Sequence, residues 1–223
     1  DMGMRGVIFD LDGVLYYTDR YHFLAWKALA DRLGLPFDQR VNDRLRGVSR
    51  MDSLEIILSL GNRRYSQAEK EQMAEEKNQH YRTYLQRMGV EALAPYATEV
   101  LCALKSEGWK LAVGSSSKNA PLILERTELE QYFDAVVDGN QITRSKPDPE
   151  VFLLAAHKLA LCPAECVVVE DAASGVQAAK AGGFYVVSIG DGTALLGPDR
   201  SISKLTELPV LCQKLRKAEL LAD

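Results

Sequence analysis

Residues 6–15 read Gly6-Val7-Ile8-Phe9-Asp10-Leu11-Asp12-Gly13-Val14-Leu15, an apolar run that ends in two aspartates separated by one residue. Val7 to Phe9 have the β-branched and aromatic side chains and the unbroken apolarity of a central parallel strand that is covered on both faces. Asp10 follows at the carboxyl end of this strand, which is where open α/β sheets bind their ligands. The stretch therefore predicts an α/β fold with a polar site at the end of its first strand.

The carboxylates of Asp10 and Asp12 are predicted to point to the same side of the extended chain, because one residue separates them. Like charges this close need a cation or a shared proton. Mg²⁺ takes oxygen ligands and keeps waters that a phosphate can replace, so it suits the pair. The alternative is a strand-end turn whose acidic residues hold no ligand.

The composition limits what the protein can be. Of the 223 residues, 47% are hydrophobic and 26% are charged, which is typical of a globular chain with one core domain and an insertion. No apolar run approaches the ~20 residues of a membrane helix, and residues 1–4 lack the features of a signal peptide. The formal net charge of −4 argues against a broad nucleic-acid-binding surface. We therefore expect a soluble, cytoplasmic monomer that binds neither nucleic acid nor membranes.

The four cysteines have no spacing that indicates a disulfide framework in a chain of this length. Cys162 and Cys166 flank Pro163 and two further residues, and a zinc site there would need a matching His or Cys pair that the neighbouring sequence lacks. We interpret this pair as buried structural thiols.

A helical block is predicted over residues 17–90. Thr18 and Asp19 offer N-cap chemistry for a helix through about Leu33, which Gly34 and Pro36 would end. Three further helical segments are predicted at roughly 38–46, 50–60 and 66–87, with almost no strand signal between them.

From about Pro95 onward, helices and short apolar strands alternate, which is typical of a parallel sheet with crossover helices. The predicted helices are 97–107, 119–128, 149–160 and 173–182, and the predicted strands are 110–114, 134–138, 166–170 and 184–189. A last covering helix is expected at about 207–221. The predicted domains are thus a core of residues 1–16 and 91–223 and an insertion of residues 17–90 after the first strand.

Three further segments follow strands or begin helices with polar residues. The run of Ser115, Ser116, Ser117, Lys118 and Asn119 places hydroxyls and free backbone N–H groups at a helix start, which can form an anion site or simply a capped helix. In Ser145-Lys146-Pro147-Asp148-Pro149, Pro147 restricts the backbone of a lysine that would otherwise be taken for a surface residue. Glu170 and Asp171 end a second apolar strand, either as an acidic helix entry or as ligands of a hard cation.

The four segments, in this order, resemble the four motifs of the haloacid dehalogenase superfamily, most of whose members transfer phosphoryl groups through an aspartyl phosphate. The resemblance implies a Rossmann-like parallel sheet core with an inserted helical cap domain. It also implies that Asp10 is the nucleophile, Asp12 the general acid and base, and Lys146 the partner of the nucleophile and the phosphate. Ser115 and the backbone of Ser116 would hold the transferring phosphate. Mg²⁺ would be bound by Asp10, Asp171, Glu170 and the main-chain carbonyl of Asp12.

The inserted block is similar to the cap of the β-phosphoglucomutases, and the similarity weakens only after about Gly190. By position, the resemblance implies that Arg50, Ser117 and Asn119 bind the phosphate that is not transferred, beside Lys118. His22 and Lys77 would link cap closure to Asp12, Thr18 would hydrogen-bond near the hinge, and Arg46, Gly47 and Val48 would face the sugar. From the residues alone, His22 is interpreted as a core histidine on a helix face and Lys77 as a solvated charge.

Two positions depart from these relatives, because Tyr17 replaces a usual Asp and Arg46 a common Lys. Neither removes a catalytic group. The leading hypothesis is a mutase that interconverts β-glucose 1-phosphate and glucose 6-phosphate through a bisphosphate. The alternatives are a small-molecule sugar-phosphate phosphatase on the same scaffold and a non-enzymatic receiver-like module phosphorylated on Asp10.

Overall fold

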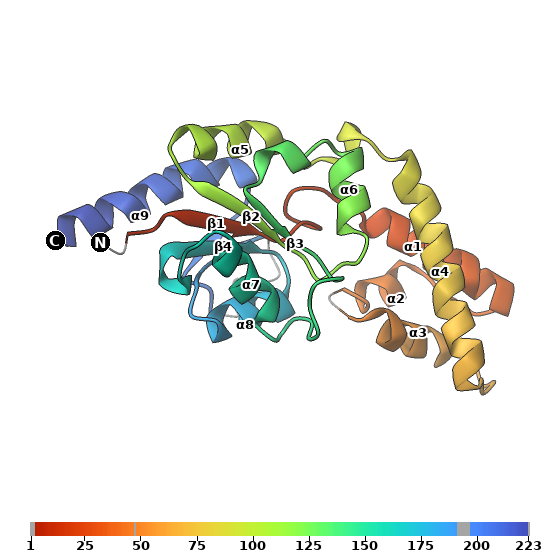
Figure 1. Ribbon diagram of the computed structural model, residues 1–223. Coiled ribbons are helices and arrows are strands. Elements are labelled where there is room, and N and C mark those ends of the chain that lie inside the picture. The colour runs from red at the N-terminus through yellow and green to blue at the C-terminus, as the bar shows by residue number, and fades with distance from the viewer. Residues whose placement is uncertain (1–2, 47, 191–196, 223) are drawn as a thin grey trace. The chain divides into compact units, whose positions relative to one another are not determined.

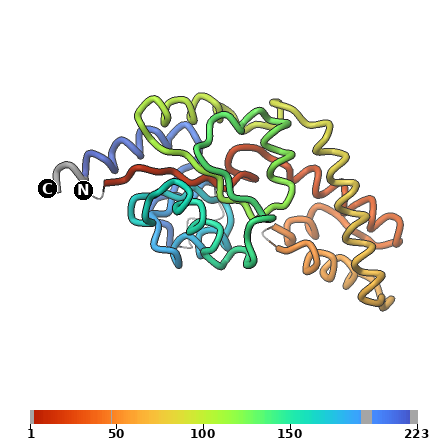
Figure 2. The backbone as a smooth tube through the Cα atoms, in the orientation of Figure 1, coloured from red at the N-terminus to blue at the C-terminus, as the bar shows by residue number. Residues whose placement is uncertain are grey.

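The computed structural model describes residues 3–46, 48–190 and 197–222 (Figure 1). The chain forms two compact units, one made of Asp1–Tyr17 with Gly89–Asp223 and the other of Thr18–Met88. The predicted boundaries, 16/17 and 90/91, differ from these by one and two residues. Figure 2 shows the chain leaving the first unit soon after its first strand and returning after the longest helix of the second. Among the described residues, no helix combines the length and apolarity that a membrane span requires.

The first unit, called the core unit below, contains a six-stranded parallel sheet, which confirms the predicted α/β fold. Its strands are β1 (Gly6–Phe9), β2 (Lys110–Gly114), β3 (Ala135–Val137), β4 (Cys166–Glu170), β5 (Tyr185–Ile189) and β6 (Arg200–Ile202). Their order is β3-β2-β1-β4-β5-β6, so the first strand in the chain lies at the centre, between β2 and β4. All four residues of β1 are buried, as its unbroken apolar run predicts.

Helices cover both faces of this sheet. The core unit contains α5 (Ala97–Ser106), α6 (Ala120–Arg126), α7 (Glu150–Lys158), α8 (Ala173–Ala181) and α9 (Leu208–Ala222). Helices α5 and α9 lie together on one face, and α7 and α8 lie on the other (Figure 1). Short 3₁₀ turns occur at Val90–Ala92, Glu130–Tyr132, Pro163–Glu165 and Leu205–Glu207.

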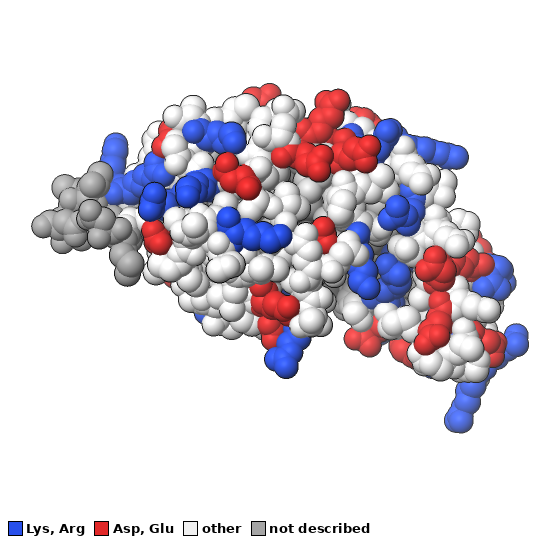
Figure 3. All heavy atoms as spheres, viewed as in Figure 1, with Lys and Arg blue, Asp and Glu red and all other residues white. Residues whose placement is uncertain are grey.

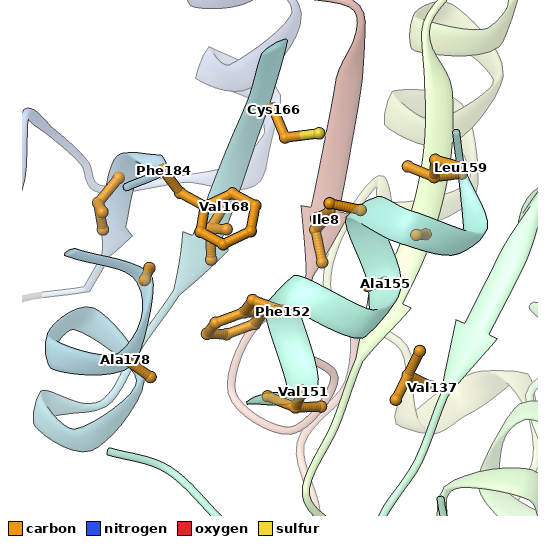
Figure 4. Packing of buried hydrophobic residues seen from close by; sticks show 14 of the residues in the cluster. Ile8, Val137, Val151, Phe152, Ala155, Leu159, Cys166, Val168, Ala178 and Phe184 are labelled. Atoms are coloured by element: carbon orange, nitrogen blue, oxygen red, sulfur yellow. The ribbon is translucent and has the colours of Figure 1, made fainter. Parts of the chain in front are cut away.

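One hydrophobic cluster joins α7 and α8 to the sheet (Figure 4). The Phe152 ring lies edge-on to Phe184, with 6.2 Å between the ring centroids, and both pack with Ile8 and Val168. A Cβ added at Gly114 would come within 2.7 Å of the Phe152 ring, so the missing side chain lets α7 approach β2 closely. Cys166 is buried in the same cluster, and burial raises the pKa of its thiol to about 12. This confirms the interpretation of Cys166 as a structural thiol, whereas Cys162 is only half-buried.

The second unit, called the cap unit below, is helical. It contains α1 (Asp19–Leu33), α2 (Gln39–Asp43), α3 (Arg50–Leu58) and α4 (Gln67–Arg87). Trp26, Leu29, Leu54 and Ile57 form its apolar centre with neighbouring side chains. Gly34 ends α1 with a φ of 70°, the left-handed conformation that glycine adopts without strain.

The structure corrects two predictions and adds one strand. Thr18 precedes α1 but makes no capping hydrogen bond, and its buried hydroxyl instead accepts a hydrogen bond from Tyr81 over 3.3 Å. The predicted helix 38–46 ends at Asp43, because the chain turns at residues 44–46. Strand β6 was not predicted, since three residues that begin with Arg and Ser are too few and too polar to show a strand pattern.

Candidate active site

Lys146 lies at the carboxyl edge of the sheet, where its ammonium group joins three elements. It donates to Asp10 Oδ1 after β1 over 3.0 Å, to the Gly114 carbonyl of β2 over 3.1 Å, and to Glu170 Oε2 of β4 over 2.9 Å. These three acceptors match the three protons of the ammonium group. The strand register brings these three acceptors together, because Phe9 pairs with Val113 and with Val169, and each of these three residues directly precedes one acceptor.

Lys146 favours its charged form although only 9% of its side chain is exposed. Burial by itself would lower the pKa of Lys146, but the carboxylates of Asp10 and Glu170 outweigh it and raise this pKa above its ordinary value. The ammonium nitrogen also lies 4.7 Å from the centre of the Phe152 ring. The positive charge of Lys146 is therefore favoured beside Asp10, and the interpretation of this lysine as a surface residue is wrong.

Three carboxylates cluster beside this lysine. Oxygen atoms of Asp10, Glu170 and Asp171 all lie within 4.8 Å of one another. Burial, followed by the charges of Asp10 and Glu170, raises the pKa of Asp171 to about 10. Burial and Asp10 likewise raise the pKa of Glu170 to about 7, against the opposing effect of Lys146. A hard divalent cation that takes oxygen ligands fits this excess of negative charge.

Two glycines make room for these carboxylates. Gly13 has a φ of 82°, and a Cβ there would overlap the carboxylate of Asp171. A Cβ at Gly175, in the first turn of α8, would overlap the carboxylate of Glu170. Glu170 is also fixed by its second oxygen, Oε1, which accepts hydrogen bonds from the backbone N–H groups of Asp171 and Ala172.

The serine-rich turn after β2 has a defined hydrogen-bonding pattern. Ser115 is 4% exposed, and its Oγ accepts a hydrogen bond from the Ser117 N–H over 3.1 Å, which leaves its hydroxyl proton for another acceptor. Ser117 Oγ accepts from the Asn119 N–H, also over 3.1 Å. The Ser116 hydroxyl oxygen is buried and has no hydrogen-bond partner among the described residues. Lys118 is exposed and follows these serines. The turn thus retains donors for an oxyanion.

His22 and Lys77 of the cap unit are in direct contact, with 2.8 Å between His22 Nδ1 and Lys77 Nζ. Lys77 is only 4% exposed and lies 4.7 Å from the ring centres of both Trp26 and Tyr81, so the interpretation of Lys77 as a solvated charge is wrong. The His22 ring stacks on Tyr81 at a centroid distance of 4.0 Å. Burial lowers the pKa of His22 well below its ordinary value, and the positive charges of Lys77 and Arg50 lower it further. The imidazole of His22 therefore resists protonation more than that of an exposed histidine.

The remaining cap residues of the predicted site lie on or between α2 and α3. Arg50, the first residue of α3, donates to the side-chain oxygen of Asn78 over 3.1 Å. Arg46 is exposed and within ion-pair distance of Asp19 and Asp43. Val48 is half-buried, and Gly47 lies outside the described residues.

Several contributors were not predicted from the sequence. Tyr81 could have been found, because it lies one helical turn after Lys77 on α4. Gly13 and Gly175 follow the acidic motifs closely, but the close approach of the carboxylates is visible only in three dimensions. Phe152 gives no sequence signal, since it reads as an ordinary core residue of α7.

The sequence profile of the haloacid dehalogenase-like hydrolase family matches residues 4–183. A β-phosphoglucomutase of Bacillus subtilis is 42% identical over 207 residues, which cover 92% of both chains. A phosphorylated carbohydrates phosphatase of Thermotoga maritima is 36% identical over 86% of this chain and 90% of its own. The crystal structure of a β-phosphoglucomutase from Clostridium difficile superposes with a TM-score of 0.86 at 33% identity, over 98% of this chain and 99% of its own. With these motifs on this fold, the chain belongs to the haloacid dehalogenase-like hydrolase family.

Proposed function

We propose that the protein is a phosphosugar mutase that interconverts β-glucose 1-phosphate and glucose 6-phosphate, with Asp10 as the phosphoryl carrier and glucose 1,6-bisphosphate as the intermediate. The observation that carries the proposal is the contact of Lys146 with Asp10, at an edge of the sheet where Glu170 and Asp171 add two more carboxylates. The similarity to β-phosphoglucomutases over nearly the whole chain supports the choice of substrate.

Asp10 is suited to be the nucleophile because its two oxygens have different roles. Lys146 holds Oδ1, so the carboxylate keeps a fixed orientation while Oδ2 can attack a phosphorus atom. In the first half-reaction the Asp10 oxygen forms a bond to phosphorus, the bond from phosphorus to the sugar oxygen breaks, and that oxygen takes a proton from Asp12. In the second, a sugar hydroxyl gives its proton to Asp12 and takes the phosphoryl group from Asp10.

A Mg²⁺ ion would be held by Asp10, Asp171 and the main-chain carbonyl of Asp12, with Glu170 beside them. When bound, Mg²⁺ supplies charge neutralisation for the phosphate oxygens. Lys146 adds a second positive charge, and Ser115 and the backbone of Ser116 offer donors to the oxygens that Mg²⁺ does not contact.

We assign recognition of the second phosphate to Arg50 in the cap unit. Its partner Asn78 is a neutral amide that does not offset the positive charge of the guanidinium, and the forked donors of this group suit a phosphate. His22 and Lys77 join α1 to α4, and Thr18, directly before α1, accepts a hydrogen bond from Tyr81 of α4. Arg46, Gly47, Val48, Ser117, Lys118 and Asn119 complete the proposed substrate-binding set.

A sugar-phosphate phosphatase is the second candidate. It is favoured by the phosphatase relative from Thermotoga maritima and by Tyr17, a 54% exposed aromatic residue where β-phosphoglucomutases usually have Asp. A phosphatase would use the same Asp10 chemistry but would let water, rather than a sugar hydroxyl, accept the phosphoryl group.

The test is to incubate the protein with Mg²⁺, β-glucose 1-phosphate and a trace of glucose 1,6-bisphosphate, and to follow phosphorus by NMR. The proposal expects glucose 6-phosphate as the main product. Free phosphate without glucose 6-phosphate would identify a phosphatase instead. A stable phosphoprotein with neither product would identify a receiver-like module.

A further inference from the structure

Asp19, the first residue of α1, lies beside Arg46 in the cap unit. The Arg46 terminal nitrogen Nη2 is 3.9 Å from Asp19 Oδ2 and 3.6 Å from Asp43 Oδ1. One guanidinium group thus lies between two carboxylates that come from different helices. Arg46 is 69% exposed, so these contacts affect its orientation and the local electrostatic potential more than the stability of the unit.

Both carboxylates are anchored by side-chain amides. Asn42, which is 2% exposed, directs its Nδ2 at both oxygens of Asp19, each at 3.4 Å. Gln39 donates to Asp43 Oδ1 over 3.0 Å. Because Asn42 is buried, its contacts with both oxygens restrict the position of the Asp19 carboxylate, and therefore the direction in which this carboxylate attracts Arg46.

The two cap arginines are consequently different electrostatically. Arg50 is held by the neutral Asn78 side chain, whereas Arg46 is flanked by two negative charges. A flanked guanidinium attracts a dianionic phosphate less than a free one does, but it can still donate directed hydrogen bonds to hydroxyl groups. Arg50 is therefore suited to bind a phosphate, and Arg46 is suited to recognise the uncharged part of the sugar.

We propose that Asp19 is a positioning residue that, with Asp43, orients Arg46 and offsets its positive charge locally, so that Arg46 contacts sugar hydroxyls rather than a phosphate. This rests on the proposed function, which supplies the sugar phosphate. A purely structural role at the start of α1, where a negative charge is favourable, would not depend on Arg46.

The test is a double-mutant cycle of Asp19→Asn and Arg46→Ala, with the KM and kcat for β-glucose 1-phosphate as readouts. An exposed ion pair of up to about 1 kcal/mol corresponds to about a fivefold change. We expect Asp19→Asn to raise KM about threefold to fivefold with a smaller change in kcat, and to have no further effect in the Arg46→Ala background. The matched control is Asp31→Asn, an exposed acid of the same helix whose partner is Lys27.

A second readout does not depend on turnover. The side-chain N–H signal of Arg46 in a ¹H–¹⁵N spectrum is expected to move in Asp19→Asn and to stay in place in Asp31→Asn. An unmoved signal, or additive effects in the cycle, would overturn the role of Asp19. If wild type makes no glucose 6-phosphate, the proposed function fails, and the Arg46 signal still decides whether Asp19 positions it.

Discussion

Lys146 determines the charge balance of the core unit, because it is the cation that contacts both Asp10 and Glu170. Removing its ammonium group in Lys146→Ala would leave two carboxylates at a nearly buried position without their partner. We expect kcat to fall by about 10²–10³-fold, since a charge that stabilises the reacting phosphate is lost. The unfolding free energy should fall by about 3 kcal/mol.

The measurement for Lys146→Ala is steady-state kinetics together with urea unfolding, in the presence and absence of Mg²⁺. Lys158→Ala is the control, because Lys158 is exposed on α7 and donates to Gln141 and the Val136 carbonyl. Near-normal turnover in Lys146→Ala would contradict the role given to this lysine.

His22 makes the stability of the folded protein depend on pH. Its pKa is lowered in the folded cap unit by burial, Lys77 and Arg50, whereas the unfolded chain has the ordinary value of 6.5. Below about pH 6.5 the unfolded chain therefore binds a proton that the folded state resists, and stability falls as the pH falls. The slope is at most about 1.4 kcal/mol per pH unit from this one group.

The variant His22→Gln removes this titration. We expect its melting temperature to change less than that of wild type between pH 7 and pH 5, as measured by circular dichroism at several pH values. His157→Gln, in the last turn of α7, is the control. Equal pH slopes for wild type and His22→Gln would show that the histidine is not held neutral by its neighbours.

At the scale of elements, α8 has an unusual start, because glycine is a poor helix former and occurs in its first turn. On helix propensity alone, Gly175→Ala would stabilise the protein by up to about 1 kcal/mol. The added Cβ would overlap the Glu170 carboxylate, so we expect lower stability and lower affinity for Mg²⁺ instead. Thermal melting and a Mg²⁺ titration of activity measure both effects, and a more stable, fully active variant would contradict this explanation.

Most elements could be predicted because their signals are local. The apolar runs within β1, β4 and β5 indicate buried parallel strands, and Gly34 correctly marks the end of α1. Strand β6 and the early end of α2 were missed because each is short and polar. The meeting of Asp10, Lys146 and Asp171 followed from four recognisable motifs, whereas the Lys77 cluster with Trp26 and Tyr81 depends on packing between α1 and α4.

At the scale of the whole molecule, the core unit contains the charge for phosphoryl transfer and the cap unit contains residues suited to a phosphosugar. Neither sign of charge dominates the face shown in Figure 3, where basic and acidic residues are interspersed. This face therefore offers no broad positive surface to an anionic substrate, which agrees with recognition by local groups.

The cluster of Asp10, Glu170 and Asp171 predicts that a divalent cation stabilises the folded protein. A ligand that binds only the folded state raises stability in proportion to the logarithm of its concentration. We expect Mg²⁺ to raise the melting temperature of wild type and EDTA to abolish turnover. In Asp171→Ala, Mg²⁺ should have little effect on melting. An equal Mg²⁺ response in both proteins would place the cation elsewhere.

Asp10 is proposed to carry the phosphoryl group, and mass spectrometry of the acid-quenched protein can detect that group on it. Wild type and Asp10→Asn are mixed with Mg²⁺ and glucose 1,6-bisphosphate, quenched in acid within milliseconds and digested. We predict one added phosphoryl group on the wild-type peptide that contains Asp10, and none on the peptide of the variant. A phosphoryl group on another residue, or an equally phosphorylated Asp10→Asn protein, would contradict the account.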